Sequence, residues 1–228
     1  LAEDPNRINP SFGFKGKVLD RNVDKLFTLF KEICLSPHLV DKARIKELIL
    51  QTHTMLENKL SKNALSYATL EASSGWSPFS YLRNQLSGLP YYTFIKQLTQ
   101  NIDTELIPLI ETFKRLQKEL FHLNDPHLIL SCDQQQYLTL EKNKFYGLDE
   151  LPAKEHAKWT NPSVKKPLSP QGRHISSPVA FSILGFQTEG KLKKHCAALS
   201  LSTEIIENCF LHSEIREKGG AYGTGANH

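Results

Sequence analysis

The sequence has 228 residues, of which 28 are Lys or Arg and 24 are Asp or Glu, so its formal net charge is +4. This length is enough for one large domain or two small ones, each with a buried core. No stretch approaches the roughly 18 apolar residues of a membrane helix, and the basic residues are too dispersed for a nucleic-acid footprint, so neither a membrane nor a nucleic acid is an expected partner.

The first 147 residues predict a helix-rich α+β domain. Phe12 and Phe14 alternate with Gly13 and Lys15, which predicts a half-buried strand over residues 12–19. A short apolar run after the Asn-Asp-Pro turn predicts a second strand over 127–132. Apolar residues at helical spacing predict helices over 22–35, 41–60, 63–72, 78–87, from Pro90 onward, 103–121 and 134–145. The strands are expected to form an antiparallel-type sheet.

The remainder divides into a linker and the start of a second domain. Residues 148–177 hold four prolines and several lysines with little apolar periodicity, as is typical of a Pro/Lys-rich interdomain linker. Residues 178–228 predict a strand over 178–186, a helix that includes 191–211, and a glycine turn. One strand and one helix cannot close a two-layer core, so the chain is expected to stop inside this second, similar domain and to be part of a longer protein.

A cation, Arg216, and a phenol, Tyr222, lie on either side of the glycine turn in the sequence. Arg216 falls in the last turn of the predicted helix, and Gly219 and Gly220 are suited to the left-handed backbone that ends a helix. The chain then runs back along the helix, which directs Arg216 and Tyr222 toward the same space. Both are able to donate hydrogen bonds to a peptide carbonyl and to the oxyanion formed from it. Equally, Arg216 is suited to stabilise the negative end of its own helix and Tyr222 to be a half-buried strand aromatic.

Several other chemistries are excluded by spacing. The pairs His195-Cys196 and Cys209-His212 lie roughly 20 Å apart along one helix, so they cannot share a metal ion. The glycine cluster follows a helix and opens an extended segment, whereas a phosphate loop follows a strand and opens a helix. No nucleophile motif is present. The four cysteines are widely spaced, which indicates reduced thiols in an intracellular protein.

The run Arg-Glu-Lys-Gly-Gly-Ala-Tyr-Gly at 216–223 resembles the signature in the last domain of the pitrilysin/insulinase family of zinc metallopeptidases, and is most similar to the presequence-peptidase branch. Matching segments occur at 16–23, 68–78 and 85–92, the last reading Gln-Leu-Ser-Gly-Leu-Pro-Tyr-Tyr. The resemblance covers residues 12–228.

This resemblance implies a four-domain enzyme whose two halves close around unfolded peptides. Residues 1–147 then correspond to the third domain and residues 178–228 to an incomplete fourth. By motif position, Arg216 and Tyr222 are the supporting catalytic donors, and Gly219, Gly220 and Gly223 contact substrate. The zinc ligands and general base, a His-x-x-Glu-His motif and a distal Glu, belong to the N-terminal half of the parent enzyme, and no metal ligand is expected in this chain.

The expected function is therefore the non-zinc-binding C-terminal part of a zinc metalloendopeptidase, inactive alone, with the zinc-bearing N-terminal half as its partner. The resemblance implies the cytoplasm of a bacterium or the organelle matrix of a eukaryote. Two alternatives remain at this point. One is a non-catalytic, peptidase-like binding or assembly subunit, and the other is an unrelated helical interaction protein.

Overall fold

The computed structural model describes residues 8, 10–121, 127–153, 160–164, 172–175, 177–188 and 195–228. Its α-helices confirm the helices predicted from apolar periodicity, with boundaries within a few residues of those expected. They are α1 (Val23–Leu35), α2 (Lys42–Lys62), α3 (Ala64–Ser73), α4 (Pro78–Ser87), α5 (Leu89–Gln100), α6 (Ile102–Leu120), α7 (Gln134–Lys142) and α8 (Cys196–Ile206). Asp20–Asn22 is a 3-10 turn, Lys144–Glu150 is a 3-10 segment interrupted by a kink at residues 145–147, and α8 continues into a π-helix over Glu207–Lys218.

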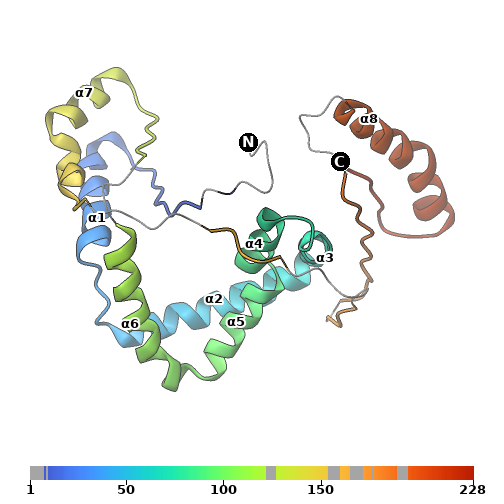
Figure 1. Cartoon of the computed structure of the whole chain (residues 1–228), viewed down its shortest axis with the longest axis horizontal. Coiled ribbons are helices and arrows are strands. Elements are labelled where there is room, and N and C mark those ends of the chain that lie inside the picture. Colours follow the sequence, from blue (N-terminus) through green and yellow to red (C-terminus); the bar gives the residue numbers. More distant parts are fainter. Residues whose placement is uncertain are drawn as a thin grey trace.

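The main core lies where α2 is crossed by α5 and α6 (Figure 1). Ile49 of α2 and Leu98 of α5 are each 8% exposed and meet the apolar stripe of α6. That stripe repeats at intervals of four residues, which is the spacing that puts side chains on one face of a helix. Its members are Ile102, Leu106 and Ile110.

A second cluster joins α1 to the segment that follows α7. Phe27 of α1 is 3% exposed, and its ring centroid lies 6.3 Å from those of both Phe145 and Tyr146. These two residues and Lys144 have φ between 49° and 54°, a left-handed conformation that costs a non-glycine residue roughly 1–2 kcal/mol. Burial of the aromatic rings against α1 offsets this cost. The cluster therefore attaches the segment that follows α7 to α1.

An ion pair reinforces the same attachment. Lys31 Nζ of α1 donates to Glu150 Oε2 at 2.5 Å. This hydrogen bond, together with the charge of the ammonium group, lowers the pKa of Glu150. The Glu150 side chain is 67% exposed, so the contact contributes little to stability and mainly orients the turn.

The predicted antiparallel-type sheet is wrong: within the described ranges, no residue belongs to a β-strand. The segments 12–19, 127–132 and 178–186 have no hydrogen-bonded ladder to a neighbour, and a ladder is what makes an extended chain a strand. The first of them packs its alternate side chains on helices instead. The ring centroid of Phe14 is 5.3 Å from that of Phe121 and 6.1 Å from that of Phe30. The fold class observed is all-helical.

The segment expected as the strand of the second domain lies against the corner between α3 and α4. Gln187 Nε2 donates to the carbonyl of Trp76 at 3.4 Å. A Cβ placed on Gly185 would lie 2.7 Å from the Trp76 ring, so only glycine allows this close approach. Much of the expected linker 148–177 lies outside the described residues, and the predicted domain boundaries remain a prediction.

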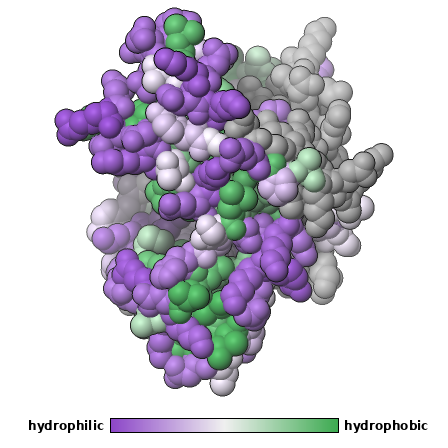
Figure 2. All heavy atoms as spheres, turned by 90° about the vertical axis from the view of Figure 1, so that its left-hand side faces the viewer, coloured by the Kyte–Doolittle hydropathy of each residue, from purple (hydrophilic) through white to green (hydrophobic). Residues whose placement is uncertain are grey.

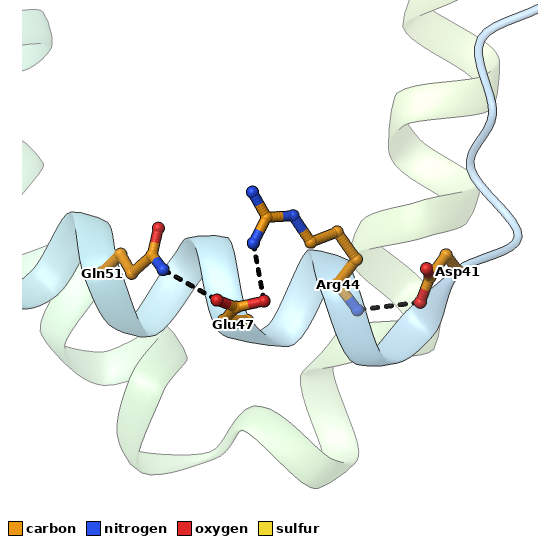
Figure 3. A network of polar contacts seen from close by, with 4 residues as sticks. All are labelled: Asp41, Arg44, Glu47 and Gln51. Atoms are coloured by element: carbon orange, nitrogen blue, oxygen red, sulfur yellow. Dashed lines mark hydrogen bonds and ion pairs between the residues drawn. The ribbon is translucent and has the colours of Figure 1, made fainter.

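The start of α2 is stabilised by a side-chain cap. Asp41 Oδ1 accepts a hydrogen bond from the backbone N–H of Arg44 at 2.9 Å, which satisfies one of the free donors of the first turn (Figure 3). One turn further on, Glu47 accepts from Arg44 Nη1 at 2.6 Å and from Gln51 Nε2 at 2.9 Å. The cap and this exposed network stabilise the N-terminal part of α2.

Replacement of the cap should destabilise the protein measurably. We expect Asp41→Ala to lower the free energy of unfolding by about 1 kcal/mol, because the Arg44 N–H loses its acceptor. Asp41→Asn keeps a capping oxygen and should stay within about 0.5 kcal/mol of the parent. Urea unfolding followed by far-UV circular dichroism measures both. Equal loss in the two variants would contradict the capping role.

The chain exposes much more surface than a compact protein of its size. Its accessible area is 17534 Å², against about 10,500 Å² for a folded monomer of 25.9 kDa. Seen from the side of α1, α6 and α7, apolar residues lie exposed between polar ones (Figure 2). Exposed apolar side chains of α6 include Ile107, Phe113 and Leu116. Within the described residues, no helix combines the length and apolar composition that crossing a bilayer requires.

Candidate functional site at the glycine turn

The predicted site lies at the end of a continuous helical rod. Residues 196–206 are α-helical, and residues 207–218 continue as a π-helix, whose backbone bonds join residues five apart. Gly219 N–H shows this spacing, since it donates to the carbonyl of Glu214 at 3.1 Å. Arg216 thus lies in the last turn of a helical segment, as expected, although that turn is wider than α-helical.

The two glycines end the rod for different reasons. Gly220 has φ of +71°, and its N–H donates to the carbonyl of Arg216 at 3.1 Å, which is the left-handed cap predicted from the sequence. Gly219 is right-handed, with φ of -81°. A Cβ there would lie 2.5 Å from the carbonyl oxygen of Ile215, so Gly219 is required for space. The turn therefore depends on both.

The chain then reverses and runs back along the rod, as the sequence predicts, but without becoming a strand. Ala226 N–H donates to Glu207 Oε2 at 3.1 Å. Further back, His228 Nδ1 lies 3.4 Å from Ser200 Oγ and 3.7 Å from Cys196 Sγ. These contacts hold the end of the returning segment against residues 196–207 of the rod.

Both candidate donors face solvent at this turn. Tyr222 is 89% exposed, which excludes the half-buried strand aromatic considered above. Arg216 is exposed too, and no hydrogen bond joins it to Tyr222, although both belong to the described part of the chain. Gly223 has open space where a Cβ would be. The turn thus presents a guanidinium and a phenol whose donor groups are accessible to an acceptor from outside.

His212 is a neighbour of Arg216 that the sequence reasoning considered only as a metal ligand. Its Nε2 lies 3.4 Å from Arg216 Nη1, and its Nδ1 lies 3.4 Å from Glu217 Oε1. The spacing of four residues to Arg216 was readable in the sequence. The contact with Glu217 was not, because it depends on the π-helix. On the same rod, Lys218 Nζ donates to Glu214 at 2.6 Å and so is already paired.

Metal-ligating side chains do not cluster at this turn. Among the residues that the structure describes, no three His, Cys, Asp or Glu side chains lie close enough together to hold a metal ion. The four cysteines are free, with Cys34 buried and Cys196 partly buried. Burial raises the pKa of the Cys34 thiol, which keeps it protonated and unreactive.

Comparison with known proteins supports the resemblance to presequence peptidases over most of the chain. Residues 2–98 match the family model for the region associated with peptidases of family M16, subfamily C. The mitochondrial presequence protease of Danio rerio is 26% identical over 99% of this chain and 24% of its own length. That of Xenopus laevis is 27% identical over 93% of this chain and 23% of its own length. The chloroplastic/mitochondrial presequence protease 1 of Arabidopsis thaliana is 22% identical over 92% of this chain and 19% of its own length. The chain thus spans about a fifth to a quarter of the length of these relatives.

Proposed function

Since the chain is related over most of its length to the presequence-protease branch of the pitrilysin/insulinase family, we propose that it is the non-zinc-binding, peptide-contacting part of a zinc metalloendopeptidase that degrades unstructured peptides. The observation that carries this proposal is the glycine turn, where exposed Arg216 and Tyr222 flank a left-handed cap. This is the segment that resembles the family signature.

The chemistry of the two donors fits a peptide in extended form. An unfolded peptide has backbone carbonyls without partners, and a guanidinium offers five N–H donors in a fixed fork. Arg216 would bind such a carbonyl and, together with the hydroxyl of Tyr222, stabilise negative charge that develops on it. Neither group activates water, because a guanidinium keeps its proton and a phenol is not a base at neutral pH. A base and a metal are therefore required from elsewhere.

Zinc, which the family implies, does not fit the described residues, since they bring no three ligating side chains together. We therefore assign the zinc ligands to another part of a longer protein. The proposed partner of this chain is that zinc-bearing part. The large exposed surface supports a partner of this kind, because apolar side chains such as Ile107 are left for a neighbouring domain to cover.

The relatives named above are mitochondrial or chloroplastic proteins, so the proposed location is an organelle matrix. In that setting, closure of two halves around a peptide would exclude folded proteins and admit only unstructured chains. The substrate class proposed is unstructured peptides, whose free backbone carbonyls would reach the exposed donors of Arg216 and Tyr222.

The proposal is tested by comparing this 228-residue chain with the longer protein that contains it. We expect the longer protein to hydrolyse an unstructured fluorogenic peptide, to lose this activity with EDTA and to regain it with zinc. The chain alone should not hydrolyse the peptide, with or without zinc. Chelator-sensitive hydrolysis by the chain alone, or no zinc-dependent hydrolysis by the longer protein, would overturn the proposal.

A further inference from the structure

Arg216 is held from the side by His212, and His212 is held in turn by Glu217. Arg216 Nη1 lies 3.4 Å from His212 Nε2, and His212 Nδ1 lies 3.4 Å from Glu217 Oε1. The imidazole of His212 therefore contacts the carboxylate of Glu217 through one nitrogen and the guanidinium of Arg216 through the other. Arg216 belongs to the proposed peptide-contacting pair, so the inference drawn from this line rests on the proposed function.

The π-helix makes this arrangement. In an α-helix, a residue five positions on is rotated by about 140° from the first, so His212 would meet Arg216 but not Glu217. A π-helix joins residues five apart, which brings Glu217 under His212 as well. Segments of π-helix occur often at functional sites. The wide turn therefore gives one imidazole two partners of opposite charge.

The chemistry of the partners fixes which nitrogen of His212 carries the proton. A guanidinium has donors and no acceptor, so Nε2 must be unprotonated to accept from Arg216. In the neutral ring the proton is then on Nδ1, the nitrogen that lies 3.4 Å from Glu217 Oε1. A carboxylate beside Nδ1 favours the tautomer that carries its proton there, since its negative charge attracts the N–H dipole.

From this geometry we propose that His212 is a positioning residue, which with Glu217 directs the guanidinium of Arg216 toward peptide carbonyls. The contacts are exposed, with 46% of the His212 side chain and 61% of the Glu217 side chain accessible, so each is weak by itself. Their effect is to orient the side chain of Arg216 before the peptide binds. Because Arg216 has already lost rotamer freedom, less conformational entropy is lost on binding.

The tautomer of His212 is the first test, made on the 228-residue chain by long-range proton–nitrogen NMR at about pH 8, where imidazole is neutral. We expect the Nδ1–H form, and a shift toward the Nε2–H form in Glu217→Leu. Glu214→Leu is the matched control, since Glu214 pairs with Lys218 and should leave the tautomer unchanged. A wild-type ring in the Nε2–H form, or one that does not respond to Glu217→Leu, would overturn the proposal.

Binding of a fluorescein-labelled unstructured peptide to the same chain is the second test. We expect His212→Leu to weaken binding about threefold to tenfold, and His212→Gln to recover most of it, because a Gln amide both accepts and donates. His212→Leu should add nothing in an Arg216→Ala background. If Arg216→Ala weakens binding and His212→Leu does not, positioning is refuted and the proposed function stands. If wild-type chain binds no peptide, or Arg216→Ala leaves binding unchanged, the proposed function fails, while the NMR result still decides the His212 contacts.

Discussion

Ile110→Ala should lower the free energy of unfolding by about 2 to 5 kcal/mol. Ile110 is 4% exposed and belongs to the only cluster of buried residues in which α2, α5 and α6 meet within the described chain. Truncation removes apolar atoms from a close-packed site and leaves a cavity that the three helices cannot close without moving. Because α6 contacts both other helices there, we expect a loss near the middle of this range or above.

The neighbouring helix turn provides a matched control. Ile107 lies on α6 three residues before Ile110 and is 55% exposed, so Ile107→Ala removes the same atoms from a largely solvated position. It should cost at most about 1 kcal/mol. Urea unfolding of both variants gives the difference directly. Equal destabilisation would mean that α6 is not packed by this stripe, and the position of the main core would then be wrong.

The success of the helical predictions and the failure of the strand predictions have one physical cause. A helix satisfies its backbone groups within its own sequence, so periodicity and caps such as Asp41 are enough to locate it. A strand needs a second segment beside it. The alternation at Phe12 and Phe14 is satisfied equally well by rings on α1 and at the end of α6, and no local feature distinguishes that packing from a sheet.

The site was predictable to the extent that it is local. The left-handed Gly220 and the return of the chain along the rod follow from glycine chemistry and were read from the sequence. The contact between His212 and Glu217 was not predictable, because nothing in the residues of 207–218 distinguishes a π-helix from an α-helix. The family role of Arg216 came from resemblance and remains a prediction.

Arg216→Ala should reduce kcat of the longer protein about 100-fold to 1,000-fold on an unstructured peptide, if Arg216 acts as proposed on the charge that develops at the carbonyl. Removal of one such donor has that effect because the site holds it in place before the reaction begins. Tyr222→Phe deletes a single hydroxyl and tests the second donor in the same way. Arg216→Lys keeps the charge but not the planar fork, so its kcat should fall between those of wild type and Arg216→Ala.

Lys218→Ala serves as the matched control, since Lys218 is an exposed cation two residues away that pairs with Glu214. It should change kcat less than about threefold, because an exposed ion pair contributes little. A fall in kcat larger than the rise in KM would place Arg216 mainly in transition-state stabilisation, whereas a rise in KM alone would restrict it to peptide binding. If Arg216→Ala and Lys218→Ala have equal rates, Arg216 contributes no more than any exposed cation at that end of the rod, and its proposed action on the carbonyl is wrong.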